Sequence, residues 1–292
     1  MLSEKKQDVA AAETYYDSDD ADRFYSAIWG GDDIHVGIYE SQDEEIARAS
    51  RRTVERMASM AEMRPGMQVA DLGAGYGGSA RYLVQRHGAA HVDCVNISQT
   101  QNRLNREKTD AIGLNDRVAV IHGSFDDIPA DDESYDLVWS QDSFLHGADR
   151  DVIMQECARV TKPGGRIIFS DIMQAPDAPK DRLQPVYDRI VLPSLGSIDF
   201  YDREAERLGL VAGPRAEMGQ QLANHYGRVR EELMARRQEL DGVVSAEYTD
   251  KMIDGLALWV QGGREGWLTW GILSYDKPGN GEVGAEGPPV AA

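Results

Sequence analysis

Short apolar runs alternate with segments of helical spacing between residues 67 and 173. This alternation predicts a parallel sheet, because each helix returns the chain to the edge at which the next strand begins. Strands are predicted at 67–72, 90–97, 117–123, 135–141 and 166–173. Helices are predicted at 77–88, 98–113 and 149–165, the second with Ser98 as its N-cap and the third stopped by Pro163 and two glycines. We therefore predict an α/β protein with a doubly wound, mostly parallel sheet.

The other segments are predicted to surround this sheet within one domain, residues 14–276. A helical leader or lid (14–64) precedes the core (65–173), and a last strand is expected at 263–276, with its apolar pattern at 266–275. Between them, 174–262 holds a stretch with four prolines at 174–197 and helical patterns at 199–209 and 219–262. The proline-rich stretch is interpreted as a lid insertion over the carboxyl edge of the sheet, where open α/β proteins bind ligands. Residues 1–13 are expected to be flexible and the tail, 277–292, disordered.

The composition argues against several classes of function. A net charge of −19 disfavours a nucleic-acid partner, because neutralising phosphates takes clustered Lys and Arg. No apolar run reaches the roughly 18 residues that span a bilayer, and the N-terminus lacks a signal-peptide stretch. We expect a cytoplasmic protein, monomeric or a small homo-oligomer. Cys94 and Cys157 stand in apolar patterns and are expected to be buried, and no residue spacing predicts a metal site.

The run DLGAGYGG, residues 71–78, follows the first predicted strand and opens the first helix of the core. Its glycines let the backbone turn sharply and approach a ligand without a Cβ in the way. Gly73, Gly75 and Gly78 formally satisfy the G-x-G-x-x-G pattern of a dinucleotide site, so a nicotinamide dehydrogenase is one reading. Asp71 favours another reading, because a carboxylate aimed at the turn would repel a pyrophosphate and attract a cationic ligand.

This D-x-G-x-G-x-G run resembles motif I of the class I S-adenosylmethionine-dependent methyltransferases. The resemblance implies a Rossmann-like, seven-stranded sheet, the sulfonium cofactor S-adenosyl-L-methionine and the product S-adenosyl-L-homocysteine. The implied cofactor-binding residues are Asp71, Gly73, Ala74, Gly75, Gly77, Asn96, Ile97, Gln101, Ser124, Phe125 and Gln141. Asn96 and Ser124 depart from the family, which carries acids at the corresponding places after the second and third strands.

A narrower resemblance rests on WGGDDIHVGIYE (29–40) together with the glycine run, VNIS, GSF, WSQDSFLH, SLGS, NHYGRV and WGIL. These stretches are similar to bacterial sarcosine/dimethylglycine N-methyltransferases, which make glycine betaine. The resemblance implies methylation of dimethylglycine, with sarcosine as a second expected acceptor. Betaine is a compatible solute, which agrees with an acidic surface adapted to a salt-rich cytoplasm. A broader resemblance, to tocopherol-type methyltransferases, leaves a larger small-molecule acceptor as the alternative, and a non-catalytic cofactor-binding module is a third hypothesis.

The candidate residues for the acceptor follow from its chemistry. Aromatic faces hold a quaternary ammonium, an Arg fork holds a carboxylate, and the amine must lose its proton before it attacks. The predicted substrate-binding residues are Trp29, Tyr25, His35, Arg189, His146 and Tyr226, with Arg182 and Arg228 as weaker candidates for the carboxylate. The predicted catalytic residues, as possible proton acceptors, are His146, Asp142 and Tyr25, which the sequence does not rank.

Overall fold

The computed structural model describes residues 19–29, 31–147, 149–190 and 194–279. The side chains of 19–22, 26, 189 and 190 lie outside this description, as do the predicted flexible N-terminus and most of the predicted tail. Across the described residues, no helix has the length and apolarity needed to cross a membrane.

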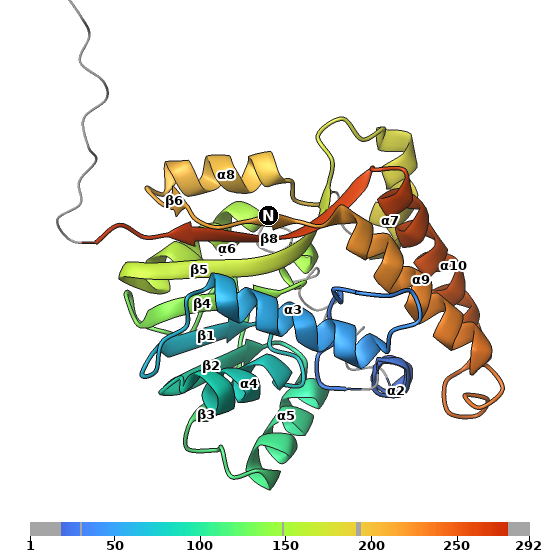
Figure 1. The fold of residues 1–292 in the computed structure, drawn as a ribbon, viewed down its shortest axis with the longest axis horizontal. Coiled ribbons are helices and arrows are strands. Elements are labelled where there is room, and N and C mark those ends of the chain that lie inside the picture. Colours follow the sequence, from blue (N-terminus) through green and yellow to red (C-terminus); the bar gives the residue numbers. More distant parts are fainter. Residues whose placement is uncertain (1–18, 30, 148, 191–193, 280–292) are drawn as a thin grey trace, which may run out of the picture.

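The core of the molecule is one sheet whose strands run in the order β3-β2-β1-β4-β5-β8-β6, with β7 also paired to β8 (Figure 1). The strands β1 to β5 are parallel and β8 is antiparallel to β5. Their bounds are β1 Gln68–Leu72, β2 His91–Asn96, β3 Val118–His122, β4 Tyr135–Gln141, β5 Thr161–Gln174, β6 Val211–Ala212, β7 Ala216–Glu217 and β8 Leu268–Asp276. The predicted doubly wound α/β fold is confirmed. The sheet has eight strands where seven were expected, because two strands of two residues each pair with β8.

Helices cover both faces of the sheet (Figure 1). Side chains of α3 and α4 pack on one face with Val69, Leu137 and Trp139, and those of α6 and α8 pack on the other with Ala70 and Leu72. Adjacent strand residues thus point to opposite faces, as the pleat requires. The helices are α2 Asp19–Ile28, α3 Ile46–Met60, α4 Gly78–His87, α5 Gln99–Ala111, η1 Phe144–His146, α6 Arg150–Val160, α7 Lys180–Ile190, α8 Ile198–Arg207, α9 Gly219–Ala235 and α10 Ala246–Arg264. Ser98 caps α5 as predicted, by accepting a hydrogen bond from the Gln101 amide.

Two predicted helices end earlier than the sequence pattern indicated. The pattern at 219–262 is divided into α9 and α10 by a connection at 236–245, in which Gly242 has a φ of 76°. Helix α6 ends at Val160, and Pro163 lies instead within β5. There the register shifts, because Thr161 pairs with Tyr135 whereas Arg166 pairs with Leu137. The proline and its glycines therefore form an irregularity in the strand, a place where a missing N–H is tolerated.

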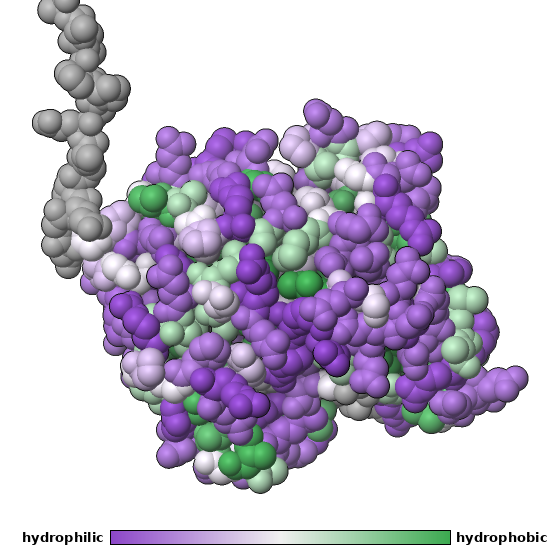
Figure 2. Space-filling view, viewed as in Figure 1, coloured by the Kyte–Doolittle hydropathy of each residue, from purple (hydrophilic) through white to green (hydrophobic). Residues whose placement is uncertain are grey.

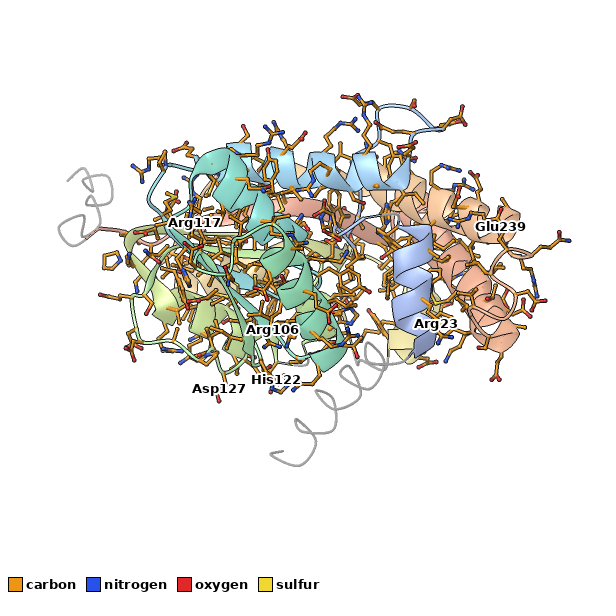
Figure 3. The ribbon with its side chains drawn as sticks, turned by 90° about the horizontal axis from the view of Figure 1, so that it is seen from below. Arg23, Arg106, Arg117, His122, Asp127 and Glu239 are labelled. Carbon is orange, nitrogen blue, oxygen red and sulfur yellow. The ribbon has the colours of Figure 1, made fainter. Side chains whose placement is uncertain are left out.

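The first part of the leader, with α2, is attached to α9 and α10 by aromatic packing. Phe24 and Trp29 belong to a buried cluster with side chains of α9 and α10, such as Val229 and Leu256. Figure 3 shows α2, with Arg23, beside the α9–α10 pair, and Arg23 Nη1 donates to the Val243 carbonyl at 3.0 Å. The leader is thus a packed layer of the fold.

Helix α7, which contains Pro185, forms the middle of the proline-rich stretch. Leu183, Val186 and Tyr187 are buried in a cluster with Trp259 of α10 and Trp270 of β8. Its role as a lid stays a prediction.

The surface and the cysteines agree with the composition. Figure 2 shows a face dominated by hydrophilic side chains, with small, separate hydrophobic areas. Cys94 and Cys157 are both free and fully buried, so their predicted burial is confirmed.

Candidate functional site

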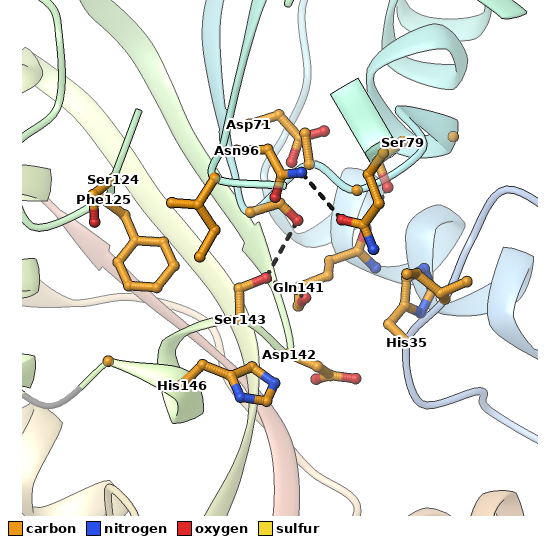
Figure 4. Close-up of a pocket in the computed structure, with 18 of the residues that line it drawn as sticks. His35, Asp71, Ser79, Asn96, Ser124, Phe125, Gln141, Asp142, Ser143 and His146 are labelled. Carbon is orange, nitrogen blue, oxygen red and sulfur yellow. Dashed lines mark hydrogen bonds between the residues drawn. The ribbon is translucent and has the colours of Figure 1, made fainter. Parts of the chain in front are cut away.

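A pocket opens where the carboxyl ends of β1, β2 and β4 meet the leader (Figure 4). It holds about 1080 Å³ of space, part of it open to solvent. In Figure 4, Asp71 and Asn96 lie on one side of this space, Asp142 and His146 on the opposite side, and Phe125 and His35 toward its two ends. The sequence-predicted residues in its wall are Asp71, Gly73, Ala74, Gly75, Asn96, Ile97, Gln101, Ser124, Phe125, Gln141, Asp142, His146 and His35.

The glycine turn has the backbone geometry that the motif requires. Gly73, Gly75 and Gly77 have φ values of 73°, 52° and 74°, in the left-handed region that favours glycine. Gly77 lies outside the pocket lining, and a Cβ there would overlap the Asn105 side chain. A Cβ on Gly73 would overlap Ser143, the residue that approaches the turn from the end of β4. The turn is therefore fixed both by its own dihedral angles and by close neighbours.

Asp71 is a buried carboxylate that lacks a full set of partners. Its side chain is 3% exposed, and its Oδ2 accepts no hydrogen bond from any described residue. Burial and the charge of Asp33 raise the pKa of Asp71 to about 7, and the charge of Arg81 opposes this shift. Such an oxygen in a pocket wall fits a cation with N–H donors. The ammonium group of S-adenosylmethionine is such a cation, so the residues present fit this cofactor.

Polar and aromatic groups follow the next two strands. Asn96 Nδ2 donates to Gln101 Oε1 at 3.1 Å (Figure 4). This hydrogen bond uses the amide nitrogen, so the side-chain oxygen of Asn96 can accept a hydrogen bond from a ligand. Ser124 forms an isolated bridge with Asp127, and Phe125 packs edge-on to Phe144 with ring centroids 5.8 Å apart. This arrangement suits the ribose hydroxyls and the flat base of the cofactor, in the order along the sheet that the sequence predicts.

Asp142 is the hydrogen-bond centre of the pocket wall. Its Oδ2 accepts from the Val36 amide at 2.6 Å, and its Oδ1 accepts from Ser170 Oγ at 2.7 Å and Trp270 Nε1 at 2.8 Å. Its φ of 49° is unusual for a residue other than glycine. Three donors from the leader, β5 and β8 thus engage this carboxylate, which favours a positioning role over the proton-accepting role predicted from the sequence.

Two histidines lie in the pocket wall. Burial, with a smaller contribution from the charge of Arg150, lowers the pKa of His146 to about 4. Burial likewise lowers the pKa of His35 to about 4, although the charge of Asp142 acts in the opposite direction. Both imidazoles are therefore neutral at neutral pH. Of the three sequence-predicted proton acceptors, His146 and Asp142 line the pocket, whereas Tyr25 is absent from its described lining.

The structure does not bring the predicted aromatic residues to the pocket. Tyr25, Trp29 and Tyr226 are absent from its described lining. Tyr25 and Trp29 pack together with ring centroids 5.1 Å apart, and Tyr226 packs against His225 and Trp259. Trp29 contacts the pocket wall indirectly, because its Nε1 donates to the carbonyl of the pocket residue His35 at 3.4 Å. These aromatic side chains pack with α9 and α10, and they thereby support the leader loop, which is the segment between α2 and α3. The sequence could not place α9 and α10 relative to the leader.

Arg189 lies in α7, and its side chain is outside the described residues. The two weaker candidates are engaged elsewhere: Arg182 lies over the Trp267 ring, 5.4 Å from its centroid, and Arg228 pairs with Glu231 at 3.0 Å.

Several residues of the wall were missed by the sequence reasoning. They are Asp32, Asp33, Ile34, Ser79, Gly147 and Asp149. Some of them adjoin a predicted residue along the chain. Asp32 and Asp33 lie far from the glycine turn in the sequence. The pattern that could have indicated them is a pair of acids directly after two glycines in the leader.

Comparison with known proteins identifies the family. A methyltransferase domain model matches residues 70–169. A sarcosine/dimethylglycine N-methyltransferase from Halorhodospira halochloris is 47% identical over 93% of this chain and 97% of its own length. Another from Aphanothece halophytica is 48% identical over 94% of this chain and 99% of its own length. The chain belongs to the sarcosine/dimethylglycine N-methyltransferase family. It is an S-adenosylmethionine-dependent methyltransferase, and the fold and cofactor predicted from the sequence are confirmed.

Solved structures agree with this assignment. A crystal structure from Galdieria sulphuraria, described as a candidate sarcosine dimethylglycine methyltransferase, superposes with a TM-score of 0.86 at 44% identity and covers 90% of this methyltransferase and 99% of that chain. A Haemonchus contortus phosphoethanolamine N-methyltransferase with bound S-adenosylhomocysteine shares the fold, with a TM-score of 0.78 at 18% identity, and covers 91% of this chain and 59% of that one.

We expect the buried carboxylate of Asp71 to lower the stability of the methyltransferase and to strengthen its binding of the cofactor. Its folded-state pKa of about 7 lies above the usual 3.8, so folding favours the protonated form. Stability that depends on this proton is fully present below about pH 4 and is lost as the pH rises through about 7. We expect Asp71→Asn to unfold in urea with a free energy about 1–3 kcal/mol higher than the parent at about pH 8. The difference should shrink toward about pH 4.

The same variant should lose measurable affinity for S-adenosylhomocysteine in calorimetry. Asp43→Asn, at an exposed position, is the control and should change neither property. An Asp71→Asn protein that is less stable than the parent at about pH 8 would show that the ionised carboxylate is compensated in the folded state.

Proposed function

We propose that this methyltransferase transfers methyl groups from S-adenosylmethionine to the nitrogen of dimethylglycine, and also of sarcosine, and thereby forms glycine betaine. The observation that carries the proposal is the 47–48% identity, over nearly the whole chain, to the two relatives of that name. A dimethylglycine N-methyltransferase from Parasynechococcus marenigrum, 44% identical over 92% of this chain, supports dimethylglycine as the acceptor. A relative whose name also includes glycine matches over only 47% of its length, so glycine is not proposed.

The chemistry of the pocket suits an amine acceptor. When bound, S-adenosylmethionine supplies an electrophilic methyl group on a positively charged sulfur. Transfer to an amine moves that positive charge from sulfur to nitrogen, so the protein needs to align the two atoms and exclude water. Carboxylates in the wall, among them Asp71, Asp33 and Asp142, favour a positive charge at either position.

We propose His146 as the group that takes the proton of the acceptor. An alkylammonium with a pKa near about 10 is mostly protonated at neutral pH, and burial in the pocket lowers that pKa. His146 lines the pocket, and its neutral imidazole can take up a proton at one ring nitrogen. Asp142 accepts three hydrogen bonds, which favours a positioning role for this carboxylate. Tyr25 is supported less, because it packs behind the leader loop.

Arg189 stays our proposal for the group that binds the acceptor carboxylate. Its place in α7, after the carboxyl end of β5, supports this role, and so does the absence of Arg and Lys from the described pocket lining. A small zwitterionic acceptor needs one fixed cation for its carboxylate, and guanidinium forms two parallel hydrogen bonds with that group.

The alternative acceptor is a larger small molecule. Tocopherol O-methyltransferases from rice and Arabidopsis thaliana are 28% and 27% identical over 89% and 87% of this chain, well below the N-methylating relatives. We also propose that the protein acts in the cytoplasm on small molecules, without a nucleic-acid partner, as a monomer or small homo-oligomer. The net charge of −19 supports the absence of nucleic acid.

The proposed reaction is tested with S-adenosylmethionine that carries a labelled methyl group. We expect label to appear in betaine when dimethylglycine is the acceptor, and in dimethylglycine and betaine when sarcosine is the acceptor. γ-Tocopherol and an aromatic phenol serve as larger acceptors. Label in these compounds, with none in any N-methylated glycine, would refute the proposal, and cofactor binding without any transfer would indicate a binding module.

Arg189→Ala tests the carboxylate site. We expect the KM for dimethylglycine to rise about 10- to 100-fold, because a charge-assisted bidentate contact is lost, with the affinity for S-adenosylhomocysteine unchanged. Arg182→Ala, about two helical turns away on α7, is the matched control and should leave KM unchanged. An unaltered KM in Arg189→Ala would remove this residue from the site.

A further inference from the structure

Asp33 is a second buried carboxylate in the pocket wall, and it comes from the leader. Its side chain is 6% exposed. One oxygen, Oδ2, pairs with Arg51 Nη2 at 2.8 Å, while Oδ1 is buried and accepts no hydrogen bond from any described residue. A polar oxygen withdrawn from water without a partner is costly, and native structures rarely keep one without a reason.

The position of the orphan oxygen is defined by α4. A Cβ on Gly78, the first residue of that helix, would overlap Asp33 Oδ1. The absence of a side chain at Gly78 therefore lets the leader carboxylate approach the helix N-terminus, where the helix dipole favours negative charge. Gly78, Asp33 and Asp71 all line the same pocket.

Of the cations near Asp33, one pairs with its carboxylate and two pair with its neighbour Asp32. Arg51 pairs with the other oxygen of Asp33, and Arg81 and Lys108 both bind the neighbouring Asp32, each at 2.6 Å. The charge of Asp33 in turn raises the pKa of Asp71. Asp33 and Asp71 thus line the same pocket as buried carboxylates of like charge, and each has one oxygen without a donor among the described residues.

We propose that Asp33 and Asp71 together bind the ammonium group at the methionine end of the cofactor. An ammonium has three N–H donors and a positive charge, which satisfies both orphan oxygens and relieves the repulsion between the carboxylates. The leader loop is then part of the cofactor site, although Asp33 lies 38 residues before Asp71 and outside the glycine motif.

The acceptor amine is the other possible source of an ammonium. The cofactor is favoured because the orphan oxygens adjoin the glycine turn, whereas His146 and Asp142 lie on the opposite side of the pocket from Asp71 (Figure 4). The inference depends on the cofactor and is independent of which acceptor the enzyme uses.

The test is Asp33→Asn, which removes the charge with little change in volume. S-adenosylhomocysteine and 5′-methylthioadenosine are titrated in calorimetry at about pH 7.5, because the second ligand keeps the nucleoside and lacks the amino-acid end. We expect the Kd of S-adenosylhomocysteine to rise about 10- to 100-fold, and that of methylthioadenosine to stay within about twofold.

Arg51→Met is the matched control, because it removes the ion pair that holds Asp33 and keeps the carboxylate. It should weaken the binding of S-adenosylhomocysteine less than Asp33→Asn does. Asp33→Glu, which keeps the charge one methylene farther from the backbone, should retain more affinity than Asp33→Asn. Thermal unfolding of each variant shows that it is folded.

Three results would overturn the proposal. The first is an unchanged Kd for S-adenosylhomocysteine in Asp33→Asn. The second is an equal loss of affinity for both ligands, which would mean that Asp33 only shapes the leader. The third is a higher KM for dimethylglycine with normal binding of S-adenosylhomocysteine, which would assign the carboxylate to the acceptor amine.

Discussion

The Asp142 carboxylate joins the parts of the molecule that enclose the pocket. It stands directly after β4 and accepts hydrogen bonds from the leader, β5 and β8 through the Val36 amide, Ser170 and Trp270. The leader loop continues beyond this contact, where the Gly37 amide donates to His225 of α9 at 3.1 Å. Because the loop is fixed at these points, Asp33 and His35 are held in the pocket wall.

The enclosed pocket is unusually rich in buried negative charge. Asp71 and Asp33 are both nearly inaccessible to solvent, and burial raises their pKa values to about 7 and about 6. An arrangement of this kind destabilises the fold by itself at neutral pH, and it is characteristic of sites where a ligand completes the electrostatics. A cationic cofactor and a reaction that moves one positive charge between two atoms both suit this environment.

The sequence predicted the parts of this account that depend on local pattern. Strand and helix alternation, the glycine turn, and the residues just after β1, β2, β3 and β4 are readable, because the carboxyl ends of parallel strands meet at one edge. Contacts between distant segments were not readable. The aromatic leader residues were expected around the acceptor, but Trp29 packs against His225, almost two hundred residues away. Asp33 was overlooked because its significance depends on its closeness to Gly78 and Asp71 in space.

The central claim is that two buried carboxylates become fully ionised when they receive the ammonium group of the cofactor. Calorimetric titration with S-adenosylhomocysteine in buffers of different ionisation enthalpy measures the protons released on binding. The ligand's own amino group, with a pKa near about 8, is already protonated near about pH 6.5 and adds little. The account predicts a net release of about 0.5–1 proton per ligand at that pH, falling as the pH rises above the pKa values of the pair. No release, or a net uptake of protons, would contradict it.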